Sequence, residues 1–110
     1  CIRDSAEAGG VEGPQEKILA DFNAKFKKRF NADVQIYAPY VYDAVNVMVD
    51  AMVKANSSDP AKYLPVLAKT AGYKGVTGDI GFDDKGDIKN GALTLHSFKA
   101  GKKITIAVVR

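Results

Sequence analysis

The stretch YAPYVYDAV, residues 37–45, joins a short apolar run to a long apolar segment. The run before it, residues 34–37, predicts a strand, and Pro39 ends that strand because proline lacks the N–H that a central ladder needs. The residues after it, 42–55, predict a helix. α/β proteins place ligands where a strand end turns into a helix. The stretch therefore predicts an α/β fold with ligand-binding tyrosines as one possibility.

Two further helices are predicted on either side of this stretch. The first covers residues 15–30, where apolar side chains recur at steps of three and four residues: Ile18, Leu19, Phe22, Phe26 and Phe30. The other begins at Asp59 and Pro60, a capping side chain followed by a first-turn proline, and ends near Gly72. Pro65 inside it predicts a kink or a shortened first turn. The helix over 42–55 is apolar on nearly every side, so we expect a sheet and another element to cover it.

The C-terminal part predicts strands and turns. A brief strand is expected at residues 79–82, followed by turn chemistry at 83–86. Residues 92–98 and 103–109 then predict a β-hairpin with one covered apolar face, because Leu93 and Leu95 alternate with polar residues. Residues 1–14 are small, polar and rich in glycine, and they predict a loop. The turn-rich residues 83–91 set the hairpin apart from the α/β part.

Composition limits the function classes. A chain of 110 residues with 46% apolar and 26% charged residues fits one globular unit with a modest core. Its net charge of +3 is mild, and its only basic run, residues 25–29, lies on an amphipathic helix, which predicts a solvated face. A small basic nucleic-acid-binding module remains a remote alternative. The start at Cys1 suggests a processed, trimmed or partial chain, and one cysteine leaves the redox compartment open.

No residue pattern predicts catalysis, a metal or a cofactor. Glycines 75, 78 and 81 follow a helix, whereas a phosphate loop precedes one, so they predict structural turns. An acidic turn contains Asp83, Asp84, Asp87 and Asn90. These residues do not have the spacing of a calcium-binding loop, so they predict a solvent-exposed turn. His96 is the only histidine and predicts an ordinary strand residue. We therefore expect a protein that is not an enzyme.

The tyrosines leave two interpretations open. Tyrosine often buries its ring and keeps its hydroxyl wet, so the pattern favours core and interface roles for Tyr37, Tyr40 and Tyr42. A binding role is the second interpretation, and it suits Tyr37 best, since that ring follows the predicted strand.

Several separated blocks resemble one known family. They are YAPYVYDAV (37–45), DPAK (59–62), YKGVTG (73–78), FDDKGD (82–87) and NGALTL (90–95). In this order they resemble periplasmic binding proteins for branched-chain amino acids (leucine, isoleucine or valine), the solute receptors of ABC importers. The resemblance is best from about residue 22 to the end, and residues 1–20 match poorly.

The resemblance implies an α/β architecture, the two-lobed type I periplasmic binding protein fold, of which this chain looks like the C-terminal third. Residues 1–14 would be a loop or hinge-proximal segment. Residues 15–90 would belong to the lobe that also holds the family's N-terminal half, and residues 91–110 would form a hairpin in the second lobe. Such receptors lie in the periplasm and present their ligand to a membrane permease.

The resemblance also implies a ligand role for one ring. The family places an aromatic side chain, where Tyr37 lies here, against the aliphatic side chain of the amino acid, and Tyr40 is a weaker candidate. The groups that hold the ligand's carboxylate and ammonium fall mainly outside this chain. We therefore expect the 110-residue chain alone to bind no amino acid with useful affinity and to dimerise or exchange elements. The alternative is the same fold used as a sensor or receptor for an amide or an aromatic compound.

Overall fold

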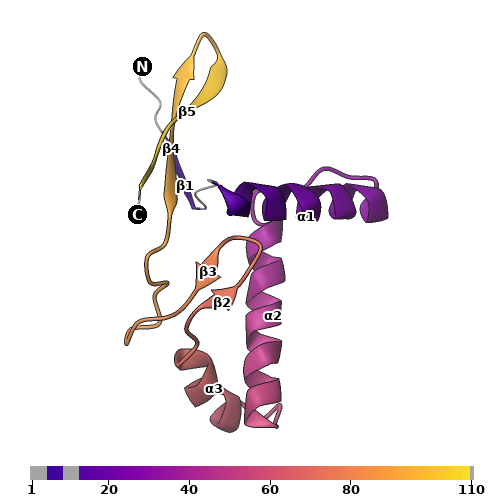
Figure 1. Ribbon diagram of the computed structural model, residues 1–110, viewed down its shortest axis with the longest axis vertical. Coiled ribbons are helices and arrows are strands. Elements are labelled where there is room, and N and C mark those ends of the chain that lie inside the picture. Colours follow the sequence, from indigo (N-terminus) through magenta and orange to yellow (C-terminus); the bar gives the residue numbers. More distant parts are fainter. Residues whose placement is uncertain (1–4, 9–12, 110) are drawn as a thin grey trace.

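The computed structural model describes residues 5–8 and 13–109, so the predictions about Cys1 and about residues 9–12 lie outside the described residues. The helices and strands form two bodies, a three-stranded sheet and a helical part that carries a small hairpin (Figure 1). In chain order the elements are β1 (Ser5–Ala8), α1 (Pro14–Phe30), α2 (Ala38–Ala55), α3 (Pro60–Ala68), β2 (Tyr73–Lys74), β3 (Asp79–Ile80), β4 (Leu93–Lys99) and β5 (Lys102–Val109).

The larger sheet has the order β1-β4-β5 with antiparallel pairing throughout. The predicted C-terminal hairpin is confirmed, with Lys99 opposite Lys102 at its tip. The loop predicted for residues 1–14 is wrong at residues 5–8, which form β1 and pair with β4. The sequence of β1, SAEA, contains no β-branched or aromatic residue. Pairing with a strand far along the chain therefore creates this strand, and local sequence could not reveal it.

The hairpin buries the opposite face from the one that was predicted. Thr94 and His96 are buried, whereas Leu93 and Leu95 on the other face of β4 are exposed. A bulge between Leu95 and His96 shifts the register with β5. In the described part of the chain, no element covers the leucine face, so the apolar alternation identified the strand but not its environment.

The predicted strand at residues 34–37 is also wrong. These residues form an irregular segment and a turn, in which the Ala38 backbone nitrogen donates to the Gln35 carbonyl at 3.0 Å. Helix α2 begins at Ala38, four residues earlier than predicted, with Pro39 in its first turn. Proline is tolerated there because the first-turn N–H groups have no partner within the helix. Among the described residues, no strand pairs with the apolar run 34–37, so β propensity alone does not make it extended.

Helix α1 fits its prediction, whereas α3 begins at Pro60 as predicted but ends at Ala68, four residues before the expected end near Gly72, with Pro65 inside it. Helix α1 differs from the expected range by one residue, and it lies across the N-terminal end of α2 (Figure 1). Phe22 of α1 packs on Tyr42 of α2 with ring centroids 5.2 Å apart, which confirms Tyr42 as a helix-packing residue. Asp59 caps α3 by accepting a hydrogen bond from the Ala61 backbone nitrogen at 3.0 Å. The basic run on α1 is exposed, as predicted for a solvated face.

Helix α2 is covered on one side only. Helix α3 packs against α2, and the β2–β3 hairpin lies beside it (Figure 1). The buried residues of α2 are Pro39, Asp43, Val47 and Ala51. A second stripe is exposed and apolar, and it contains Val41, Val45, Met48, Val49 and Val53. The expected cover, a sheet and another element, is thus present only on the side of α3 and the two-stranded β2–β3 sheet, and no described element covers the exposed stripe. The chain exposes 8255 Å², against about 5,900 Å² for a compact protein of this mass.

Candidate functional site: the start of helix α2 and the 75–77 loop

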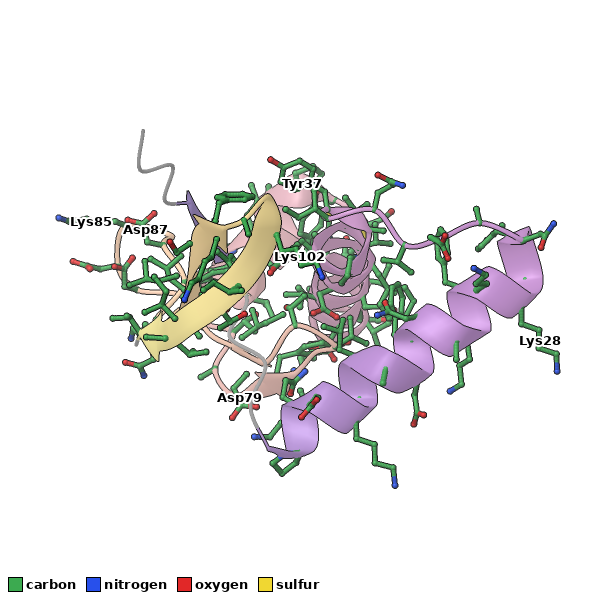
Figure 2. The ribbon with its side chains drawn as sticks, turned by 90° about the horizontal axis from the view of Figure 1, so that it is seen from above. Lys28, Tyr37, Asp79, Lys85, Asp87 and Lys102 are labelled. Carbon is green, nitrogen blue, oxygen red and sulfur yellow. The ribbon has the colours of Figure 1, made fainter. Side chains whose placement is uncertain are left out.

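The three tyrosines of the 37–45 stretch lie in different environments. Tyr42 packs against α1. Tyr37, at the N-cap position of α2, has 73% of its surface exposed, and Figure 2 labels it at that end of the helix. Tyr40 lies in the first turn and is half-buried. The structure therefore separates Tyr37 and Tyr40, the predicted ligand-binding residues, from Tyr42, which has a packing role.

One turn after Tyr40, the Asp43 side chain is buried, with 3% of its surface exposed. Its Oδ1 accepts a hydrogen bond from the Val76 backbone nitrogen at 2.9 Å. Its Oδ2 accepts two more, from the Thr77 backbone nitrogen at 2.8 Å and from the Thr77 hydroxyl at 2.5 Å. Burial of a carboxylate is costly unless hydrogen bonds replace its hydration. The loop of residues 75–77 supplies those bonds to Asp43.

Glycine at position 75 is required by this contact. A Cβ added there would lie 2.5 Å from Asp43 Oδ2 and 2.9 Å from the Ile80 Cδ1. The Gly75 backbone nitrogen also donates to the Gly78 carbonyl at 2.9 Å, which closes the loop. The predicted structural role of these glycines is confirmed at position 75. The loop does direct backbone N–H groups at an anion, as phosphate loops do, but the anion is Asp43 of the same chain.

Helix α1 contacts the same loop. The Gln15 side-chain nitrogen donates to the Val76 carbonyl at 2.5 Å and to the Gly75 carbonyl at 3.3 Å. Side chains from the first turn of α1 and the second turn of α2 therefore both hold the loop between β2 and β3. The sequence alone assigned no role to Asp43, a polar residue in a helix that is apolar on nearly every side. Its signal was a carboxylate within an apolar helix, followed later in the chain by the block GVTG.

The acidic turn after β3 is a structural turn. Asp83 Oδ1 accepts hydrogen bonds from the Asp87 and Lys85 backbone nitrogens, both at 2.9 Å. The hydrogen bond from Asp87, then that from Lys85, lowers the pKa of the Asp83 carboxyl below its ordinary value, since these bonds favour the charged form. Among the residues that the structure describes, no group of three or more His, Cys, Asp or Glu side chains could hold a metal ion.

A cavity of about 350 Å³ lies elsewhere, between α1 and the segment that follows it. It is lined by Asn23, Ala24, Lys27, Asp33 and Val34. Lys27 and Asp33 form an exposed ion pair beside it. The cavity includes neither Tyr37 nor Tyr40, so it is not the predicted ligand site. No helix in the described part of the chain is long and apolar enough to cross a membrane.

Comparison with known proteins identifies similar chains. No family model matches the chain. It is 32% identical over 87 residues to the leucine-, isoleucine-, valine-, threonine- and alanine-binding protein of Pseudomonas aeruginosa, a match that covers 79% of this chain and 22% of the relative. The chain thus spans about a quarter of the length of the curated relatives that it matches.

Solved structures share the fold. An ABC transporter substrate-binding protein from Desulfitobacterium hafniense in complex with leucine superposes with a TM-score of 0.75 at 25% identity, and the match covers 94% of this chain and 30% of that protein. A solute-binding protein from R. palustris in complex with benzoate superposes with a TM-score of 0.68 at 16% identity, covering 96% and 29%. The expected fold class, part of a type I periplasmic binding protein, is confirmed. In sequence and fold, the chain is similar to a segment of the branched-chain amino-acid-binding proteins of ABC transporters, and this segment makes up about a quarter to a third of the length of each such protein.

Proposed function

We propose that the chain is part of an extracytoplasmic solute-binding protein that captures a branched-chain amino acid for an ABC importer. The sequence similarity to the P. aeruginosa protein carries the proposal, because that relative is named for leucine, isoleucine and valine binding. The protein would lie in the periplasm, act without catalysis and without a cofactor, and deliver its ligand to a membrane permease. Residues 15–90 would belong to one lobe and residues 91–110 to the other.

Fold alone does not select the ligand. The same fold occurs in a leucine complex and in a benzoate complex. The curated relatives named for leucine, isoleucine and valine favour an aliphatic amino acid over an aromatic compound or an amide. This chain contributes an apolar ring, and a zwitterionic ligand also needs charge-assisted partners when it leaves water. Those partners would come from a longer receptor chain.

Tyr37 is the side chain to which we assign the ligand contact. Tyr37 has 73% of its surface exposed at the start of α2, whereas Tyr42, which is 51% exposed, packs its ring on Phe22. An exposed ring can bury apolar area against an aliphatic side chain at about 25 cal/mol per Å². Tyr40, half-buried one turn along, would line the site more weakly.

The proposal is tested in a segment-swap receptor, the P. aeruginosa protein with its matched segment replaced by that of this chain. Thermal unfolding is followed with increasing leucine, isoleucine, valine and benzoate, since a ligand that binds the folded state raises the melting temperature with its concentration. We expect the three aliphatic amino acids to raise it. A folded swap receptor that responds only to benzoate, or to none of the four while the unswapped protein responds, would contradict the proposal.

A further inference from the structure

The contact between Asp43 and the 75–77 loop has a second consequence at the start of α2. Helix α2 has no side-chain hydrogen bond at its N-cap, Tyr37, and no acidic residue in its first turn. A helix start without a side-chain cap frays unless other contacts hold it. Here the Ala38 backbone nitrogen donates to the Gln35 carbonyl and the Val41 nitrogen to the Tyr37 carbonyl, both at 3.0 Å. Asp43, in the second turn, accepts three hydrogen bonds from the loop and so ties this end of the helix to a segment more than 30 residues later in the chain.

We propose that Asp43 is a positioning residue, which holds the first two turns of α2 against the 75–77 loop and so fixes Tyr37 and Tyr40. The inference rests on the proposed ligand role of those tyrosines. Asp43 follows Tyr40 by three residues and Pro39 by four, so all three lie on neighbouring parts of one helix face. Pro39 is itself buried, which places this face inside the molecule.

The geometry of the loop makes the contact specific. Two hydrogen bonds come from consecutive backbone nitrogens, whose positions are fixed by the loop conformation, and the third comes from the Thr77 hydroxyl. Gln15 of α1 holds the Val76 carbonyl on the other side of the same peptide units. Gly75 leaves the space that the carboxylate occupies. A change at any of these positions is therefore expected to move the loop relative to α2.

The test uses the 110-residue chain and nuclear magnetic resonance, with no ligand present. Hydrogen exchange is measured at the Val76 and Thr77 amides, together with the aromatic ring signals of Tyr37 and Tyr40. In Asp43→Ala we expect exchange at both amides to accelerate about tenfold or more, as loss of a buried hydrogen-bond partner produces. We also expect the Tyr37 and Tyr40 ring signals to shift.

Two controls separate positioning from a general loss of structure. Asp50→Asn changes another carboxylate of α2, which pairs with Lys54 and does not contact the loop, so it should leave all these signals unchanged. The ring signals of Tyr63 on α3 should remain in place in Asp43→Ala. Accelerated exchange with unchanged Tyr37 and Tyr40 signals would overturn the inference, since Asp43 would then hold only the loop.

A milder pair of variants keeps the test valid if Asp43→Ala does not fold. Thr77→Val removes one donor to Asp43, and Thr77→Ser keeps it. We expect Thr77→Val to shift the Tyr40 signals and Thr77→Ser to retain the wild-type ones, whereas equal behaviour of the two would contradict the inference. Because no ligand is used, this result is independent of whether leucine binds, and failure of the proposed function would appear only in the segment-swap receptor.

Discussion

Gly75 and Asp43 lie so close that a Cβ on residue 75 would be 2.5 Å from the carboxylate oxygen of residue 43. This pair joins the β2–β3 hairpin to α2, and Gln15 extends the contact to α1. The 75–77 loop therefore links the β2–β3 hairpin to both α1 and α2.

Gly75→Ala should destabilise the chain. The added methyl group must displace a buried carboxylate or the Ile80 side chain, and overpacking of this kind costs about 1–3 kcal/mol. Chemical denaturation followed by circular dichroism measures the change. Gly91→Ala is the matched control, because the nearest atom to an added Cβ lies 3.8 Å away, and its effect should stay within about 0.5 kcal/mol. Equal stability of the two variants would argue against the close approach.

Phe22 and Tyr42 should be energetically coupled. Their tilted rings are the aromatic contact between α1 and α2, and aromatic pairs contribute about 0.5–1.5 kcal/mol beyond their buried area. A double-mutant cycle of Phe22→Ala and Tyr42→Ala measures the coupling through unfolding free energies. The same cycle with Phe22 and Tyr63 should be additive, since Tyr63 lies on α3. Additivity of the first pair would show that α1 is held by other contacts.

Asp83 should give stability that depends on pH. Its folded-state pKa lies below the ordinary value of 3.8 because backbone N–H groups bind the charged form. The contribution is therefore fully present above the unfolded-state pKa, and it is lost as the pH falls through the folded-state pKa. Unfolding of the wild type and of Asp83→Asn is compared at several pH values. The difference should be largest above pH 4 and should shrink at lower pH, while an unchanging difference would refute this assignment.

The isolated chain should self-associate and should not bind leucine measurably at micromolar concentration. The exposed stripe on α2 and the excess of accessible surface leave apolar area that water contacts unfavourably. Analytical ultracentrifugation should give a mass above that of a monomer. Val45→Lys on this stripe should weaken association, whereas Lys62→Ala on α3 should not. A monodisperse monomer with sharp cooperative unfolding would contradict the prediction that the exposed apolar stripe on α2 drives self-association.

Local patterns predicted the local elements. Helix α1 and the C-terminal hairpin follow from periodicity within a few residues, and the cap of α3 follows from Asp59 alone. Strand β1 exists because β4 pairs with it, and residues 34–37 are not a strand because no strand in the described part of the chain pairs with them. These outcomes depend on partners distant in sequence, so propensity could not decide them.

The candidate site shows the same division. The 37–45 stretch placed Tyr37 at the end of a predicted strand and Tyr40 before a predicted helix, and its resemblance to binding proteins suggested their role. The role of Asp43 depends on a loop 33 and 34 residues later, which only the three-dimensional structure brings to it. A carboxylate within an apolar helix and a spaced glycine block are visible in the sequence, but their contact is not.

The central claim, that Tyr37 provides an apolar wall for a branched-chain amino acid, is tested most directly by calorimetric titration of leucine into the segment-swap receptor. We predict that Tyr37→Phe, which keeps the ring, binds leucine within about threefold of the parent, and that Tyr37→Ala binds about tenfold or more weakly through lost apolar burial. Equal leucine affinity of the alanine and phenylalanine variants, with both folded, would contradict the claim.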